Sequence, residues 1–249
     1  MLSSDTLDTN GIWYCGFGHD GNDDHKVIVI CYSCESPGSP FKSDFSHVYS
    51  LKTNSWKEVE RCPYSVYGFM VNIAAITACG AIHFIAYEDM IASFDLAKEE
   101  YKVVPKPDVN IADDALVTLS LGTLGGCLCL TYKEYIFVFH EIWSLWLLKE
   151  YGNLSSWTNI AKVRPSEGIG SLSHLCLIDY SDSEKELILQ DKFSGSMVRY
   201  YIENGLAKKV KIEGKRKRKV VVYSHVYQES LVQLKNGDPS VSWEEFGRE

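Results

Sequence analysis

The stretch HVYSLKTNSWKEV at positions 47–59 decides the fold, because the chain repeats its pattern three more times with variation. Each copy reads as a short strand, a polar turn, and an aromatic or aliphatic residue that opens the next strand. The further copies are IASFDLAKEEYKVV at 91–104, the segment from IWSLW to SSWTNI at 142–160, and the weaker MVRYYIENGLAKKV at 197–210. This repetition predicts a chain built from antiparallel hairpins of one kind.

The spacing of the repeats predicts a β-propeller. Aligned on Trp56, Tyr101, Trp157 and Lys208, the copies are 45, 56 and 51 residues apart. Periods of about 40–50 residues with four strands per unit are typical of propeller blades. We therefore predict an all-β fold, a kelch-like β-propeller that is incomplete, with about four to five blades. A β-sandwich, which also contains many short strands and turns, is the less favoured alternative.

Apolar runs rich in Val, Ile, Tyr and Phe, bounded by Gly, Asn, Asp and Ser, predict an inner and an outer hairpin for each blade. The segment 16–24 is dense in turn-forming residues and is expected to form turns before a strand at 26–32. Positions 149–152 are expected in a long hairpin loop, and the last strands are expected at 220–223 and 230–234. The repeated aromatic residues Trp56, Tyr101 and Trp157 are expected to pack between adjacent blades.

Composition and charge exclude several classes of function. The 249 residues are 45% hydrophobic and 23% charged, as in an ordinary globular protein. A net charge of −8 argues against a nucleic-acid partner. The sequence contains no apolar stretch of the roughly 18 residues that a membrane helix needs, and it does not begin like a signal peptide. The eight cysteines are therefore expected as thiols in a reducing compartment, and the chain is expected to be cytoplasmic or nuclear, with no membrane partner.

Residue patterns that support chemistry are weak in this sequence. Cys31 and Cys34 have zinc-ligand spacing, but no second C-x-x-C supplies the other ligands, so thiols packed in the core or a loop are favoured. The seven histidines form no metal-binding motif, and there is no nucleophile elbow or phosphate-binding glycine loop. The paired carboxylates at 23–24 and 113–114 occur in turn-like contexts, where Asp accepts hydrogen bonds from backbone amides. We predict no catalytic residue, no cofactor and no metal.

Several motifs, in order, resemble the plant F-box associated domain, which forms the C-terminal half of many plant F-box proteins. The likeness covers roughly residues 11–234. The matching segments are GFGHD at 16–20, DDHKV at 23–27, VYSLKTNSW at 48–56, CGAIHF at 79–84, SFDL at 93–96, LGGCLCL at 124–130, LKEYG at 148–152 and SSWT at 155–158. On this basis the domains are expected to be a disordered N-terminus at 1–10, the F-box associated β-propeller at 11–234, and a flexible tail at 235–249.

The resemblance implies a non-catalytic module that recognises the substrate of an SCF-type E3 ubiquitin ligase. Its expected partner is a target protein for ubiquitination. The F-box, which docks on the adaptor subunit of the ligase, is expected to be absent, since the sequence starts almost at the GFGHD motif. Binding to the adaptor is therefore expected only if missing sequence supplies an F-box.

Contacts with a target are expected on loops, because propeller loops vary without disturbing the strands. The candidate loops are 35–45, 62–69, 108–115 and 164–171. The candidate partner-binding residues are Tyr64, Tyr67, Phe69, Asp113 and Asp114. Aromatic residues are favoured as binding anchors, although packing of the three aromatic residues in the core is an equal alternative.

Two further alternatives stay open. The basic run at 215–219 is favoured as a solvated hairpin tip, and a nuclear localisation signal is the other interpretation. The alternative function is a propeller hydrolase or glycan-processing enzyme with carboxylates clustered at the central channel. Two or more Asp or Glu side chains converging in a concave pocket would favour that enzyme.

Overall fold

A computed structural model describes residues 12–34, 36, 38–66, 75–109, 116–136, 140–164, 175–181, 183, 185–191 and 196–210. These residues form sixteen strands in four antiparallel sheets of four strands each. Within the same residues, no helix has both the length and the apolar character needed to span a membrane. The chain is therefore all-β in its described part, as predicted.

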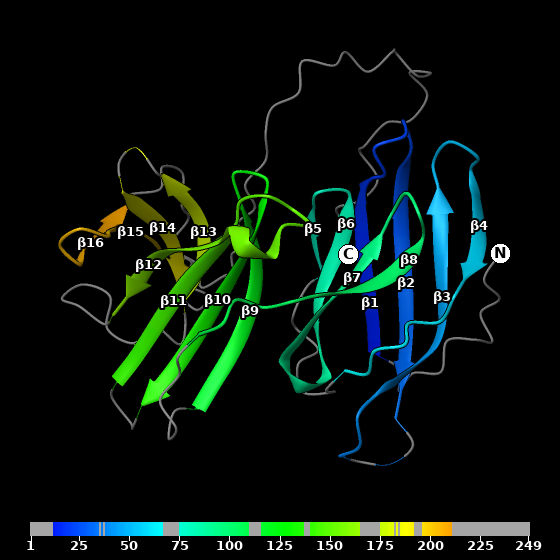
Figure 1. Cartoon of the computed structure of the whole chain (residues 1–249), viewed down its shortest axis with the longest axis horizontal. Helices are drawn as coiled ribbons and strands as arrows, with labels where there is room; N and C mark the ends of the chain where they lie inside the picture. The colour runs from blue at the N-terminus through cyan, green and yellow to red at the C-terminus, as the bar shows by residue number, and fades with distance from the viewer. Residues whose placement is uncertain are drawn as a thin grey trace, which may run out of the picture.

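The strands follow one another in chain order within each sheet (Figure 1). The first sheet contains β1 (Ile12–His19), β2 (His25–Ser33), β3 (Lys42–Ser50) and β4 (Ser55–Val59). The second contains β5 (Ile76–Ala78), β6 (Ala81–Ala86), β7 (Met90–Asp95) and β8 (Glu100–Val104). The third contains β9 (Leu116–Leu124), β10 (Cys127–Ile136), β11 (His140–Leu148) and β12 (Trp157–Val163). The fourth contains β13 (Leu175–Ser181), β14 (Glu186–Asp191), β15 (Met197–Tyr201) and β16 (Leu206–Val210).

The four sheets stand side by side as the blades of a β-propeller. The first strand of each blade contacts the first strand of the next, β1 with β5, β5 with β9 and β9 with β13. In Figure 1 the sheets form a row with β1–β4 at one end and β13–β16 at the other. The predicted propeller is therefore present, and the sandwich alternative is wrong.

The repeated stretches are the outer hairpins of the four blades, as predicted. Each consists of the third and fourth strands of its sheet, and equivalent residues pair across the hairpin: Tyr49 with Trp56, and Phe94 with Tyr101. The polar turns bring the chain through the left-handed region, at Asn54 (φ 50°) and Gly205 (φ 67°). Asn and Gly accept this conformation readily, which is why the repeat has a polar turn before its aromatic residue.

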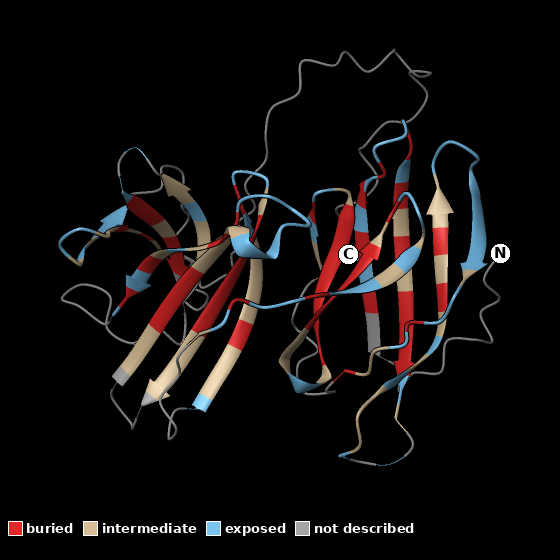
Figure 2. Ribbon diagram, viewed as in Figure 1, coloured by how far each residue is buried: buried red, intermediate tan, exposed pale blue. Residues whose placement is uncertain are grey.

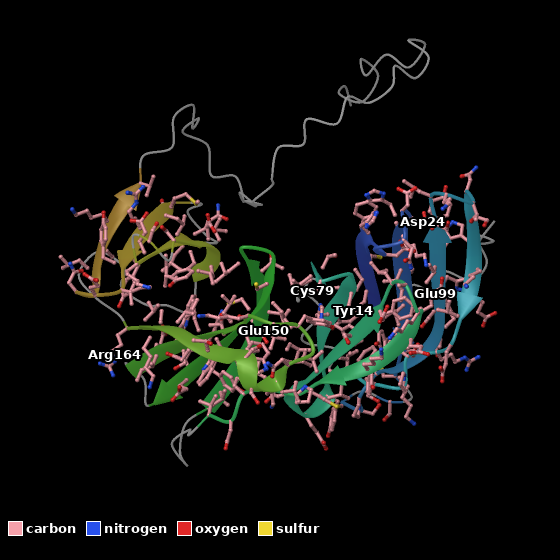
Figure 3. The ribbon with its side chains drawn as sticks, turned by 45° about the horizontal axis from the view of Figure 1, so that its top comes forward. Tyr14, Asp24, Cys79, Glu99, Glu150 and Arg164 are labelled. Carbon is pink, nitrogen blue, oxygen red and sulfur yellow. The ribbon has the colours of Figure 1, made fainter. Side chains whose placement is uncertain are left out.

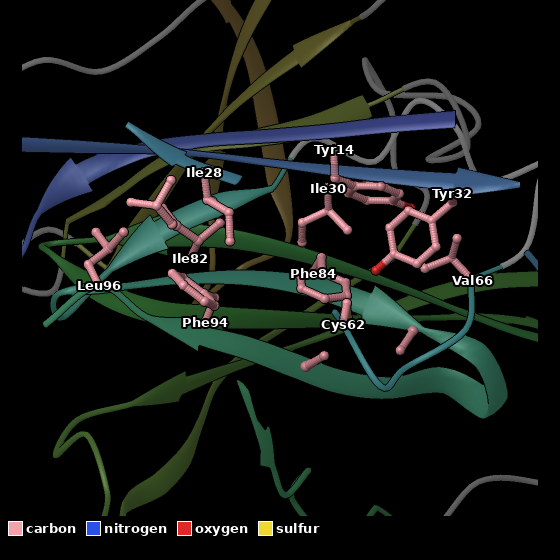
Figure 4. Packing of buried hydrophobic residues seen from close by; sticks show 13 residues of the cluster. Tyr14, Ile28, Ile30, Tyr32, Cys62, Val66, Ile82, Phe84, Phe94 and Leu96 are labelled. Atoms are coloured by element: carbon pink, nitrogen blue, oxygen red, sulfur yellow. The ribbon is translucent and has the colours of Figure 1, made fainter. Parts of the chain in front are cut away.

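Three apolar clusters fill the spaces between neighbouring blades. In the first cluster, Ile28 and Ile30 of β2 face Ile82 and Phe84 of β6, with Phe94 of β7 beside them (Figure 4). Figure 2 shows that the buried residues lie mainly along the central strands, whereas the fourth strands β4, β8 and β16 are largely exposed and β12 is partly buried. The middle strands bury side chains on both of their faces. The hydrophobic effect of this burial is the main contribution that holds neighbouring blades together.

The prediction that residues 16–24 form turns is wrong for the first part of this segment. Only the part after His19 is a turn, since Gly16 and Gly18 lie inside strand β1. A Cβ atom on Gly16 would lie 2.5 Å from Cγ2 of Ile82, and one on Gly18 would lie 2.7 Å from Cγ2 of Thr77. The glycines therefore permit close packing of β1 against the second blade, which their turn propensity does not reveal.

The repeated aromatic residues behave as predicted in two of three cases. The Tyr101 hydroxyl donates to Oγ of Ser46 in the first blade (2.8 Å), and the Trp157 indole Nε1 donates to the Pro105 carbonyl after the second blade (3.0 Å). The prediction is wrong for Trp56, which is 41% exposed and packs on Tyr49 of its own sheet. The equivalent side chains point to the preceding blade, and among the described residues no sheet precedes the first.

Several predictions lie outside the described residues. They are the terminal segments 1–10 and 235–249, the basic run at 215–219, and the strands at 220–223 and 230–234. The predicted loop at 149–152 does lie between β11 and β12, followed by a short 3-10 turn at Leu154–Ser156.

Candidate functional site

The two ends of the blades differ in what they carry. The turn end holds the hairpin connections that join the first strand to the second and the third to the fourth. The connection end holds the second-to-third strand loops together with the links between blades. Hydrogen bonds join the connection-end segments of neighbouring blades: the Phe41 and Val66 backbones pair at 2.8 and 2.9 Å, and the Tyr87 amide donates to the Ser65 carbonyl at 2.7 Å.

All four candidate loops belong to the connection end. The loop 35–45 joins β2 to β3, although its residues from Lys42 onward are already part of β3. The loops 62–69, 108–115 and 164–171 fall within the three links between blades. Positions 35, 37, 67–69, 110–115 and 165–171 of these loops lie outside the described residues.

Of the predicted partner-binding residues, the structure describes one. Tyr64 is half-buried and packs against the apolar cluster between the first two blades. Burial raises the pKa of its hydroxyl, with a smaller contribution from the nearby Cys62 thiol. These contacts favour the core-packing alternative for Tyr64. The other four, Tyr67, Phe69, Asp113 and Asp114, lie outside the described residues.

A short strap, residues 105–109, leads from the second blade to the third. Two side chains of the third blade hold it by its carbonyls. The Trp157 indole donates to the Pro105 carbonyl (3.0 Å), and the Tyr132 hydroxyl donates to the Pro107 carbonyl (3.3 Å). Both of these anchoring carbonyls belong to prolines, which have no amide hydrogen that needs a partner. The strap is therefore tied to the third blade at two points.

The strap and the third blade border an open pocket of about 380 Å³. Its walls combine both signs of charge with apolar and aromatic surface. The lining residues are Asp108, Val109, Glu134, Ile142, Ser144, Trp146, Asn159, Lys162 and Arg164. Asp108 and Arg164 are the first residues of two of the predicted contact loops. The pocket therefore lies where two candidate loops begin.

Strand register explains how the pocket is laid out. Glu134 of β10 is opposite Ile142 of β11, and Ser144 of β11 is opposite Lys162 of β12. The middle strand β11 thus supplies the floor, β10 supplies an acidic side, and β12 a basic side. Arg164, which directly follows β12, adds a second cation at the edge of the third blade (Figure 3).

Few hydrogen bonds join the polar side chains that line the pocket to one another. The Ser144 hydroxyl donates to Oε1 of Glu134 at 3.4 Å. The indole Nε1 of Trp146 is buried and has no hydrogen-bond partner within the described part of the chain. A buried donor without a partner is costly, so this indole is a polar group that the described part of the fold leaves unsatisfied. The arrangement is suited to binding a charged, partly apolar group.

The alternative of channel carboxylates fits this pocket poorly. Asp108 and Glu134 do share the pocket, which meets the condition of two carboxylates in one concave site. However, Asp108 belongs to the strap and Glu134 to the second strand of its sheet, whereas the strands that contact one another at the centre are β1, β5, β9 and β13. The pocket is therefore not the channel site on which the enzyme alternative was based.

Comparison with known proteins identifies the family of this propeller. The sequence profile of the F-box associated beta propeller domain matches residues 4–234. The chain belongs to this family. The resemblance inferred from the sequence motifs is thereby confirmed, together with the propeller fold.

The relatives of this F-box associated domain are plant F-box proteins. F-box protein CPR1 of Arabidopsis thaliana is 28% identical over 209 residues, which is 75% of this chain and 49% of that protein. F-box protein At4g22390 of the same plant is 26% identical over 213 residues, 77% of this chain and 50% of that protein. The chain thus spans about half the length of these relatives. A solved structure, YCF48 from Cyanidioschyzon merolae, aligns with 82% of the chain at 8% identity and a TM-score of 0.30, which is too low to support an argument.

The GFGHD and DDHKV motifs of the F-box associated domain tie the first two blades together at the turn end. The buried ammonium of Lys26 lies 3.3 Å from Asp20 and 3.1 Å from Glu99, and it donates to the Leu96 carbonyl at 2.7 Å. Asp24 accepts from the Ser50 hydroxyl (2.6 Å) and the Lys52 amide (2.9 Å), as expected for a turn carboxylate. Figure 3 shows Asp24 and Glu99 at this end of the molecule.

The CGAIHF and LKEYG motifs tie the second blade to the third. His83 is fully buried in β6, and its Nε2 lies 2.8 Å from the Tyr151 hydroxyl of the β11–β12 loop. Burial lowers the pKa of His83 to about 4, although contacts with the backbone at Ile76 and Ala81 oppose the shift. His83 is therefore a hydrogen-bonded structural residue.

The described cysteines differ in burial: Cys62 and Cys129 are buried, whereas Cys15 and Cys79 are exposed. Cys31 is buried in β2 and Cys34 is half-buried after it. Burial raises the pKa of the Cys129 thiol to about 12, so this group stays protonated at neutral pH. Over the described ranges, no group of three or more His, Cys, Asp or Glu residues is arranged to hold a metal ion.

The sequence motifs therefore fasten blade to blade, and the pocket is made by other residues. Sequence analysis missed Glu134, Trp146 and Lys162 as site residues. Their one signal was alternation, because Glu134 and Tyr132 lie two residues apart on the same strand face. That pattern indicates a shared face but does not show that a strap from another blade borders it.

Proposed function

We propose that this propeller is the target-binding module of an SCF-type ubiquitin ligase receptor, and that the connection end of the second and third blades is its binding surface. The observation that supports this most strongly is the pocket of about 380 Å³ at the start of two candidate contact loops. The relatives named above are F-box proteins. The proposed role is non-catalytic, since the chain would hold a protein that the ligase modifies.

The proposed mechanism is one of effective concentration. A bound target stays close to the ubiquitin-charged enzyme when an F-box links the propeller to the ligase adaptor, so transfer becomes effectively intramolecular. The partners are therefore a target protein and, through an F-box, the adaptor subunit, in the cytoplasm or nucleus. A propeller supplied in excess without an F-box would bind the same target and protect it from the ligase.

A photo-crosslinking experiment in plant cells tests this role. The exposed strap residue Lys106 is replaced by a photoreactive amino acid in the full chain, and the exposed Leu206 on β16 serves as the matched control position. We expect Lys106, but not Leu206, to crosslink to a protein whose half-life lengthens when the chain is overproduced. Crosslinks only to proteins with unchanged half-life, or no crosslink from Lys106, would refute the proposal.

A further inference from the structure

The charges of the connection-end pocket are separated across its floor. Glu134 lies on β10, and Asp108 of the strap is close enough to Tyr132 of that strand to add to the effect of burial, which raises the pKa of the Tyr132 hydroxyl. Lys162 and Arg164 lie on the β12 side. Adjacent strands are about 4.8 Å apart, so backbones two strands apart are separated by about 10 Å. Within the part of the chain that the structure describes, no ion pair joins the two sides. Both pairs of charges are therefore available to a ligand.

The floor between the charges favours an aliphatic chain. Ile142 and Trp146 contribute apolar and aromatic surface, and Ser144 lies between them on the same strand. Lys and Arg side chains cover such a surface with their methylene stems while their charged ends reach a carboxylate. A basic side chain can thus lie on the floor with its charge at Glu134 and Asp108.

An extended peptide offers two charges at a matching distance. Side chains at positions i and i+2 of an extended chain point to the same side, about 7 Å apart. With the reach of long side chains, such a pair can span the roughly 10 Å between the two sides of the pocket.

We propose that the connection-end pocket recognises a target segment in which a basic and an acidic side chain are two residues apart in an extended chain. The basic side chain pairs with Glu134 and Asp108, and the acidic one with Lys162 and Arg164. This inference rests on the proposed function, because it assigns the pocket to recognition of the target.

Peptide titrations monitored by NMR test the charge pattern. The full chain, labelled with ¹⁵N, is titrated with Gly-flanked Lys-Ser-Glu and Glu-Ser-Lys peptides and with Lys-Ser-Lys and Glu-Ser-Glu peptides. We expect the mixed-charge peptides to shift the Trp146 indole signal, which the Trp146→Phe variant assigns. Peptides of a single sign should bind about 3–10-fold more weakly, as expected for loss of one partly exposed ion pair with added repulsion.

Charge reversal separates recognition from a general loss of structure. Glu134→Lys should move the preference toward Glu-Ser-Glu, and Lys162→Glu toward Lys-Ser-Lys. Glu58→Lys and Lys98→Glu, which reverse exposed charges in the first and second blades, are the matched controls and should change nothing. A gain of affinity for a new peptide requires a folded protein, so misfolding cannot produce this result.

Two outcomes would overturn the inference. One is that no peptide shifts the Trp146 signal, and the other is that the preferences do not follow the reversed charges. The outcome for the proposed function is separate. A target that crosslinks to Lys106 and is bound equally by the Glu134→Lys and Lys162→Glu variants would leave the target-binding role intact and remove this pocket from it.

Discussion

Single glycines set how closely the first two blades approach. Gly16 lies in β1 where any side chain would meet Ile82 of the second blade, 2.5 Å from the position of a Cβ. We expect Gly16→Ala to lower the free energy of unfolding by about 1–3 kcal/mol, the usual cost of overpacking a core. Urea denaturation measures this. Gly122→Ala in β9 is the control, since nothing lies within 4 Å of its Cβ position.

The contact partner of Gly16 provides a second check of the same prediction. Shortening Ile82 to Val removes a methyl group beside the new alanine, so the double variant should recover part of the lost stability relative to Ile82→Val alone. If Gly16→Ala and Gly122→Ala unfold at the same urea concentration, then β1 does not pack on β6 as described.

At the scale of elements, the join between β6 and the β11–β12 loop should make stability depend on pH. The pKa of His83 falls from an ordinary 6.5 to about 4 on burial. The unfolded chain therefore binds a proton below pH 6.5 that the folded chain rejects, so stability falls as the pH drops from 6.5 toward 4. The expected loss between pH 7 and pH 5 is about 2 kcal/mol.

Comparison with a variant isolates the contribution of His83 from that of the carboxylates. His83→Gln keeps a polar group near the Tyr151 hydroxyl but does not titrate. Urea midpoints at pH 7 and pH 5 should therefore differ less for the variant than for the unaltered chain. Equal pH dependence in the two proteins would show that His83 is not the group that titrates.

The elements that sequence analysis predicted well are those fixed by local pattern. The outer hairpins follow from an aromatic residue, a polar turn and a left-handed residue such as Asn54, all within about a dozen residues of chain. Strand β1 was missed because its glycines are required by long-range contacts: Gly16 packs against Ile82 of β6 and Gly18 against Thr77 of β5, both about sixty residues further along the chain. Local propensity carries no information about such a contact.

Of the residues that line the pocket, only those at its edges could be predicted from the sequence, because the others are brought together by contacts between distant parts of the chain. Asp108 and Arg164 were found as the first residues of loops, since Pro and polar residues mark loops in the sequence. Glu134, Trp146 and Lys162 come together through the register of β10, β11 and β12, and the strap from the second blade then borders them. Register and long-range contacts are set by tertiary packing.

At the scale of the whole molecule, equivalent positions of the repeat should contribute differently to the free energy of unfolding, depending on which blade they belong to. Trp157 lies between the second and third blades and is tied to the Pro105 carbonyl, whereas Trp56 occupies the same repeat position on the first blade and is 41% exposed. Phe17, on the first strand of that blade, is 54% exposed. We expect Trp157→Ala to lower the free energy of unfolding by about 3–4 kcal/mol and Trp56→Ala by less than about 1 kcal/mol.

Varying the protein concentration distinguishes packing within one chain from packing between two copies of the chain. Chemical denaturation of both variants is measured at low and high protein concentration, because a surface covered by a second molecule gains stability by mass action. If Trp56→Ala costs as much as Trp157→Ala at every concentration, the face of the first blade that carries Trp56 and Phe17, which is exposed among the described residues, is packed within the whole chain. If the cost of Trp56→Ala grows with concentration, that face is covered by a second copy. A small and constant cost is the result that a free face requires.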